Sequence, residues 1–149
     1  MKNKMLFMGI ITIVLLFMVV GTVSAQTFSD ARARQVLNIV GISIWESAPG
    51  RTSLEGIRVA TINAIVELKR VSGAEIVITG GTESGHASGT YSHANGYKVD
   101  LRTTPSLNNY IERNFRRDGT VGGHPAYKCP AGNLYVRESN PPHWDVVVY

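Results

Sequence analysis

The chain has 149 residues, with 15 basic side chains, 11 acidic side chains and a single cysteine. One cysteine excludes both an internal disulfide and a cysteine-rich structural zinc site. At the N-terminus, residues 1–25 combine a basic start, an apolar stretch and small residues at the end, which is typical of an export signal. Removing Lys2 and Lys4 with this segment leaves 13 basic and 11 acidic residues, a balance that gives little reason to expect nucleic acid as a partner.

We expect cleavage after Ala25, so that residues 26–149 form a single exported, monomeric domain, secreted or periplasmic in the cell envelope. An uncleaved leader is the alternative and would be the chain's one contact with a membrane, because its apolar stretch is near the lower length limit of a span. A domain of this size can fold without disulfides, and Cys129 is expected to be a small buried hydrophobe.

Capping and breaking residues predict three helices in the exported part. Ser29 is expected to cap a helix over about residues 30–40, and Ser53 a longer helix over about 54–71 that ends at Gly73. Apolar residues at helical spacing support both. The predicted buried face of the second helix contains four residues: Ile57, Ala60, Ala64 and Leu68. The third helix follows Thr104-Pro105 and is expected over about residues 106–115.

Short apolar runs between turn signals predict strands. They cover about residues 74–79, 97–101, 126–129, 134–137 and 144–149. The predicted connections are residues 43–51 with a turn at Pro49-Gly50, the loops 80–92 and 118–124, and four residues joining the third and fourth strands. Because helices come mostly first and strands mostly last, the expected class is α+β, with N-terminal helices packed on a small, largely antiparallel sheet.

Two histidines and an aspartate form the most informative pattern in the chain. His93 and Asp100 are seven residues apart, and an odd separation puts two side chains on opposite faces of one straight strand. A bend at Asn95-Gly96 would let both reach one ion, and His143 begins the last predicted strand. Imidazole nitrogen and carboxylate oxygen suit zinc, and three protein ligands plus water are typical of a catalytic site.

These residues resemble a known family. The pattern His93-x-x-Gly96-x-x-x-Asp100, followed by His143-Trp144, is similar to the zinc D-alanyl-D-alanine carboxypeptidases and L-alanyl-D-glutamate endopeptidases, which share a core with the Hedgehog signalling domain. The resemblance covers about residues 80–149. It implies a Hedgehog/D,D-peptidase-like fold, with His93, Asp100 and His143 as ligands of Zn²⁺. It also implies an exported metallopeptidase that hydrolyses the stem peptides of peptidoglycan.

The chain departs from the family's pattern at several positions. The family usually carries an arginine just after the preceding strand, to hold a substrate carboxylate or the developing oxyanion, whereas residues 79–83 contain none. Tyr91 stands where a serine is usual, with Ser92 one position later, and Lys98 replaces an alanine. These departures leave open a catalytically inactive wall-binding module of the same fold, or a secreted domain without a metal.

Two carboxylates are candidates for the general base. The family's acid is usually three residues before the last zinc histidine, where this chain has Asn140. Glu138 is the nearest upstream carboxylate and is our predicted base, because a base must reach the metal-bound water. Asp145, which should share the strand face of His143, is the alternative. Trp144, between them, should point to the core.

Three further residues in the glycine-rich loop are candidates for supporting roles. His86 is predicted either to contact the substrate in place of the missing arginine or to be an ordinary loop residue. Glu83 and Ser92 could orient the metal ligands from outside, as neighbouring polar groups often do, or could be solvated loop residues.

Overall fold

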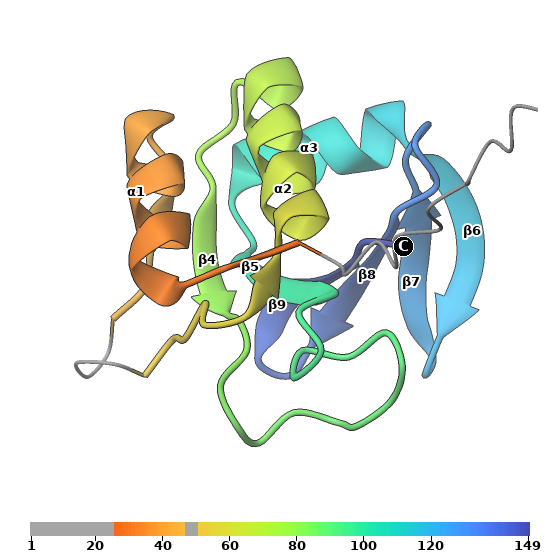
Figure 1. The fold of residues 1–149 in the computed structure, drawn as a ribbon. Coiled ribbons are helices and arrows are strands. Elements are labelled where there is room, and N and C mark those ends of the chain that lie inside the picture. The colour runs from red at the N-terminus through yellow and green to blue at the C-terminus, as the bar shows by residue number, and fades with distance from the viewer. Residues whose placement is uncertain (1–25, 47–50) are drawn as a thin grey trace, which may run out of the picture.

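The computed structural model describes residues 26–46 and 51–149, so the expected leader and the Pro49-Gly50 turn lie outside the described residues. Within these ranges the fold is α+β, as predicted (Figure 1). The helices are α1 (Asp30–Ile39), α2 (Val59–Ser72) and α3 (Pro105–Asn114). None of the helices in the described part is both long and apolar enough to cross a membrane.

Seven strands form one mostly antiparallel sheet in the order β2-β4-β5-β9-β8-β7-β6, in which only β2 and β4 run parallel. In chain order they are β2 (Ser43–Ile44), β4 (Val77–Gly80), β5 (Lys98–Arg102), β6 (Arg116–Val121), β7 (His124–Lys128), β8 (Leu134–Ser139) and β9 (Pro142–Val147). Two short strands, β1 (Thr27–Phe28) and β3 (Ile57–Arg58), pair antiparallel apart from this sheet.

The first helix begins where its predicted N-cap placed it, whereas the second begins later than predicted. The side chain of Ser29 accepts a hydrogen bond from the backbone of Arg32, which makes it the N-cap of α1. However, α2 begins at Val59 instead of residue 54, and Ser53 is not its cap. Residues 54–58 instead form a turn and the strand β3, because pairing with β1 satisfies their backbone groups there.

Because α2 begins later than predicted, only part of its predicted buried face is correct. Leu68 is buried, but Ala60 is exposed and Ala64 is only partly buried. The buried side chains of the helix are Thr61, Ile62, Ile65 and Leu68. The end of the helix was predicted correctly, since Gly73 adopts a left-handed conformation with φ of 61°.

Several strand predictions also need correction. β4 begins at Val77, later than predicted, and β6 occupies much of the predicted loop 118–124. The polar, glycine-containing sequence of β6 lacks the alternation of a half-buried strand because nearly all of its residues are exposed at the sheet edge. The connection between β7 and β8 has five residues, and Cys129 within it is only partly buried against the core.

The sheet has one apolar face and one polar face. Alternate residues of its central strands, including Val99, Leu101, Trp144 and Val146, share a core with side chains from all three helices. Trp144 is fully buried, as predicted, and its indole N–H donates to Asn108 on α3 over 2.9 Å. Because side chains alternate along a strand, the residues between these positions point to the opposite face.

Thr104 caps the N-terminus of α3 and links it by a hydrogen bond to the segment before β4. Its hydroxyl accepts from the backbone N–H of Leu107 and donates to the backbone carbonyl of Glu75, and Thr104 is buried. We therefore expect Thr104→Ala to lower the free energy of unfolding by about 1–2 kcal/mol, the usual cost of losing an N-cap. Urea denaturation should show this loss, with a much smaller one for Thr103→Ala. Equal losses would contradict the capping role.

Candidate metal centre

The polar face of the sheet gathers the predicted site residues from two neighbouring strands. In the antiparallel pair of β5 and β9, Asp100 lies directly opposite Asp145, and Arg102 lies opposite His143. The odd separation of Trp144 from both His143 and Asp145 keeps the indole in the core and leaves the other two side chains on the polar face. The pairing of strands thus brings together residues that are more than forty positions apart in the chain.

His93 reaches the same place from a turn. Ser92 supports this turn, because its hydroxyl accepts from the backbone N–H of Asn95 (3.3 Å) and its carbonyl accepts from that of Tyr97. Gly96 makes the bend with φ of 72°. The predicted bend is therefore present. Ser92 is a buried part of it and not a solvated loop residue.

Both histidines are held by backbone carbonyls on the side away from the site. Nδ1 of His93 lies 2.8 Å from the carbonyl oxygen of Gly81, and Nδ1 of His143 lies 2.8 Å from that of Pro141. In the neutral imidazole, a carbonyl acceptor places the proton on Nδ1 and leaves the lone pair on Nε2. This is the arrangement that orients histidine ligands in metal sites.

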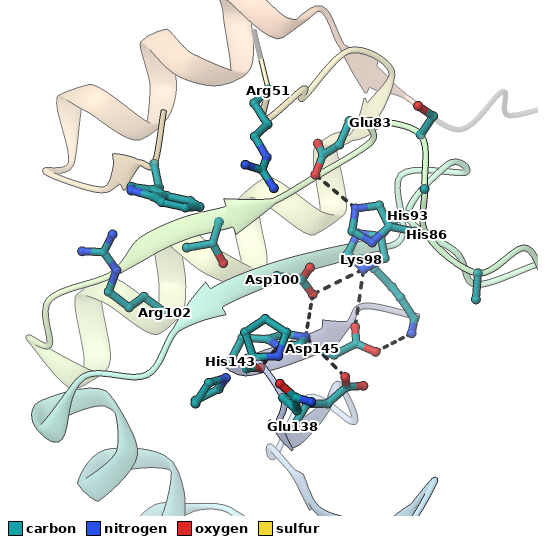
Figure 2. A pocket seen from close by; sticks show the side chains of 18 residues that line it. Arg51, Glu83, His86, His93, Lys98, Asp100, Arg102, Glu138, His143 and Asp145 are labelled. Atoms are coloured by element: carbon teal, nitrogen blue, oxygen red, sulfur yellow. Dashed lines mark hydrogen bonds and ion pairs between the residues drawn. The ribbon is translucent and has the colours of Figure 1, made fainter. Parts of the chain in front are cut away.

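The two Nε2 atoms lie close to one oxygen of Asp100 (Figure 2). Oδ1 of Asp100 is 3.4 Å from Nε2 of His93 and 3.6 Å from Nε2 of His143. This oxygen is buried and accepts no hydrogen bond from the described residues. In a tetrahedral zinc site with bonds of about 2.0–2.1 Å, neighbouring ligand atoms are about 3.3–3.4 Å apart. The two contacts of Asp100 are thus close in length to ligand–ligand distances in a zinc site, but His143 does not belong to the group of described residues whose ligand atoms all lie within 4.8 Å of one another.

His93 and Asp100 favour each other's charged forms. Burial by itself would lower the pKa of His93, but the contacts with Asp100, the carbonyl of Gly81 and Asp145 together outweigh burial and raise that pKa. Burial would likewise raise the pKa of Asp100, but the contact with His93 and the nearby His143 and His86 hold it below its usual value. A buried carboxylate that stays ionised next to two imidazoles is suited to bind a cation.

A second grouping of ligand atoms includes His86. Ligand atoms of His86, His93 and Asp100 all lie within 4.8 Å of one another, so these three residues could hold a metal ion. However, the rings of His86 and His93 are stacked, with centroids 3.8 Å apart and planes 15° apart. An imidazole lone pair lies in the plane of its ring, so two nearly parallel stacked rings do not direct their lone pairs at one point.

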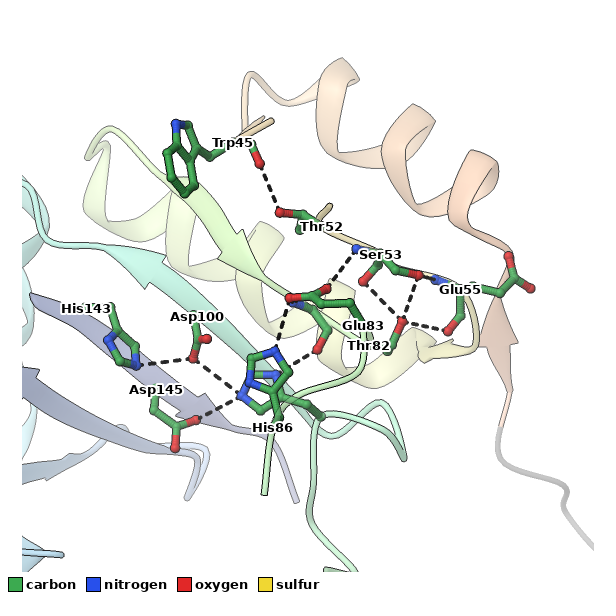
Figure 3. Close-up of polar contacts among 12 residues, drawn as sticks. Trp45, Thr52, Ser53, Glu55, Thr82, Glu83, His86, Asp100, His143 and Asp145 are labelled. Carbon is green, nitrogen blue, oxygen red and sulfur yellow. Dashed lines mark hydrogen bonds and ion pairs between the residues drawn. The ribbon is translucent and has the colours of Figure 1, made fainter. Parts of the chain in front are cut away.

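Glu83 organises the loop that carries His86 (Figure 3). Its carboxylate accepts from the backbone N–H groups of Ser53 (2.8 Å) and Gly81 (3.0 Å) and lies 3.1 Å from Nε2 of His86. Burial would raise the pKa of Glu83, but these hydrogen bonds outweigh it and lower that pKa. Since Gly81 also orients His93 through its carbonyl, Glu83 supports the cluster from outside and is not a solvated loop residue.

The two candidate bases differ in their surroundings. Oε2 of Glu138 lies 3.5 Å from Nε2 of His143, and the Glu138 side chain is 35% exposed at the cavity wall. Asp145 is more deeply buried, and its Oδ2 lies 2.6 Å from Nζ of Lys98. Its Oδ1 is 3.8 Å from Nε2 of His93 and, like that of Asp100, is buried without a hydrogen bond from the described residues.

All of these groups line one open cavity of about 990 Å³. Three cavity residues were missed by the sequence analysis, namely Trp45, Arg51 and Arg102. Arg102 lies one residue beyond the predicted strand 97–101 but on the observed β5, two residues from Asp100. Trp45 and Arg51 belong to a predicted connection whose sequence gave no indication of a site. Lys98 was recognised only as a departure from the family's pattern.

Comparison of the chain with protein-family models, with curated proteins and with solved structures found no match.

Proposed function

We propose that this protein is an exported zinc peptidase that hydrolyses stem peptides of peptidoglycan, by D,D-carboxypeptidase or L-alanyl-D-glutamate endopeptidase chemistry. The observation that carries the proposal is the approach of two imidazole Nε2 atoms to one buried carboxylate oxygen of Asp100, at 3.4 and 3.6 Å. The resemblance of the His93–Asp100 and His143-Trp144 patterns supplies the substrate class.

His93, Asp100 and His143 are the proposed zinc ligands. His143 is preferred to His86 because its Nε2 faces Asp100, while its Nδ1 is held by a carbonyl. The ring of His86 is instead stacked on His93 and its Nε2 contacts Glu83. His86 and Glu83 then keep His93 in place and close one side of the cavity.

A zinc ion held by these residues would lower the pKa of a bound water toward neutrality and polarise a peptide carbonyl. Glu138 accepts a proton from the attacking water and delivers it to the leaving amine. Glu138 suits this role better than Asp145, because it is more exposed to the cavity and Asp145 is already paired with Lys98. Arg51 and Arg102 also line the cavity and add positive charge to its wall.

Hydrolysis of purified muropeptides tests this proposal. We expect the zinc-loaded wild type to cleave the stem peptide, and Glu138→Gln to keep its zinc but lose about 10²–10⁴-fold in kcat, the usual contribution of a general base. Glu112→Gln, which changes a surface carboxylate paired with Arg137, is the matched control and should retain full activity.

Zinc binding without cleavage of any stem peptide by the wild type would contradict the peptidase proposal and favour a wall-binding module. An active Glu138→Gln together with an inactive Asp145→Asn would move the base to Asp145.

A further inference from the structure

Lys98 is a partly buried cation in the wall of the candidate site. It lies on β5 two residues before Asp100, so both side chains leave the same face of the strand and line the cavity. Nζ of Lys98 is 2.6 Å from Oδ2 of Asp145, and the two side chains are 24% and 13% exposed. The ammonium is thus fixed beside the His93–Asp100–His143 cluster (Figure 2).

The strand pairing explains why a cation is needed there. Asp100 and Asp145 occupy directly opposite positions on β5 and β9, and like charges in such a pair repel each other. Each aspartate has a buried Oδ1 without a hydrogen bond from the described residues, and both of these atoms lie within 4 Å of Nε2 of His93. A metal ion at Asp100 and the ammonium at Asp145 would compensate one carboxylate each.

The ammonium has donors beyond the one that Asp145 uses. A lysine ammonium carries three N–H donors, and it is a compact charge on a flexible stem. Since Lys98 lines the cavity, its remaining donors can reach a group bound there. The chain lacks an arginine in residues 79–83, so a cationic donor from another element is chemically useful in this cavity.

We propose that Lys98 is a catalytic residue, whose ammonium donates a hydrogen bond to the carbonyl oxygen of the scissile peptide bond. This inference rests on the proposed peptidase function. The oxygen of water bonds to the carbonyl carbon, and the electron pair of the C=O π bond moves onto the carbonyl oxygen. Lys98 stabilises the negative charge that forms on this carbonyl oxygen. The C–N bond then breaks, and the proton taken from water by Glu138 goes to the leaving amine. Lys98 keeps its own proton throughout.

A purely structural role for Lys98 makes a different prediction. If the ammonium only balances the charge of Asp145, then replacing Lys98 should not change kcat once residue 145 is neutral. Comparing Lys98→Met in the wild-type and Asp145→Asn backgrounds separates the two roles. Replacing both members of a buried ion pair with neutral side chains is usually tolerated, so the double variant should fold.

The experiment measures zinc affinity, KM and kcat with muropeptides for the wild type, both single variants and the double variant. In the Asp145→Asn background we expect Lys98→Met to lower kcat by about 100-fold or more, the usual cost of losing a donor to an oxyanion. Zinc affinity and KM should change by no more than about threefold, because ground-state binding is not the role of this donor. Lys98→Arg should recover part of the lost kcat, since it keeps a cationic donor.

Lys128→Met is the control, because Lys128 also forms an ion pair with an aspartate, Asp118, but away from the cavity, where the contact is longer (3.4 Å) and more exposed. It should leave kcat unchanged. Equal kcat values for Asp145→Asn and the double variant would overturn the proposal and leave Lys98 a charge-balancing role. An inactive, zinc-bound Asp145→Asn would also overturn it, by making Lys98 the partner of an essential carboxylate. In both cases the wild type stays active, whereas failure of the peptidase proposal itself leaves the wild type inactive.

Discussion

Asp100→Asn is expected to remove tight zinc binding while leaving the domain folded. Oδ1 of Asp100 is the atom shared by the two histidine contacts, and its negative charge attracts the cation. Loss of an outer partner of a metal ligand already costs about 10–100-fold in affinity, so losing the ligand itself should cost about 100-fold or more. Isothermal titration of the metal-free protein with zinc measures this change directly.

Thermal unfolding gives a second readout of the same substitution. Zinc at about 100 times its Kd should stabilise the wild type by about 2.7 kcal/mol, and this gain should disappear in Asp100→Asn. The metal-free variant should itself be somewhat less stable than the metal-free wild type, because the contacts with His93 and His143 that lower the pKa of Asp100 stabilise its carboxylate. Asp118→Asn, at a surface ion pair, is the control and should bind zinc like the wild type. Undiminished zinc affinity in Asp100→Asn would eliminate the proposed centre.

Two histidine substitutions distinguish the possible ligand sets. His143→Ala should lose zinc affinity about as severely as Asp100→Asn, because each removes one of three proposed ligands. His86→Ala should lose far less, since its ring is stacked on His93 and contacts Glu83. The reverse result would assign the third ligand position to His86.

Gly96→Ala is expected to be strongly destabilising. Gly96 has φ of 72°, and a Cβ atom there would lie 2.8 Å from the carbonyl oxygen of Gly56 and 2.9 Å from the backbone nitrogen of Arg58. The left-handed conformation costs about 1–2 kcal/mol for a residue with a side chain. Forcing an atom into a packed site typically costs a further 1–3 kcal/mol or so. The expected total of roughly 2–5 kcal/mol is a large part of a small domain's stability.

The matched control for this prediction is Gly73→Ala. Gly73 has a similar φ of 61°, but nothing lies within 4 Å of the position that its Cβ would take. It should therefore lose only the conformational part, about 1–2 kcal/mol. Urea denaturation of both variants compares the two costs. Similar losses would show that the close approach of residues 56–58 to Gly96 is not a constraint. Zinc affinity should also fall in Gly96→Ala alone, because this bend sets His93 relative to Asp100.

Particular residues show where sequence reasoning succeeded. Ser29 and Gly73 bounded helices through local hydrogen bonding and local backbone conformation, which are visible in a few neighbouring residues. The strict alternation along a strand predicted that Trp144 would be buried and that its neighbours His143 and Asp145 would face the other way. The bend at Gly96 followed from the same parity argument, applied to His93 and Asp100.

Other positions were decided by partners far away in the chain. Ser53 has the residue type of a helix cap, yet its backbone N–H donates to Glu83 and its carbonyl accepts from Thr82. The residues after it form a turn and β3 because β1 was available to pair with them. β6 carries too few apolar residues to be recognised, and it becomes a strand because β7 supplies its hydrogen bonds.

The amino-acid sequence by itself determined the α+β class, most helix ends, and which residue types were chemically able to bind a metal, since these depend on local conformation and on periodicity. Only the tertiary structure decided that Lys98 meets Asp145, that His86 stacks on His93, and that Trp45, Arg51 and Arg102 share one cavity with the cluster. The physical reason is that strand pairing and loop packing bring together residues that are far apart in the chain. Such contacts do not appear in the local periodicity of the sequence.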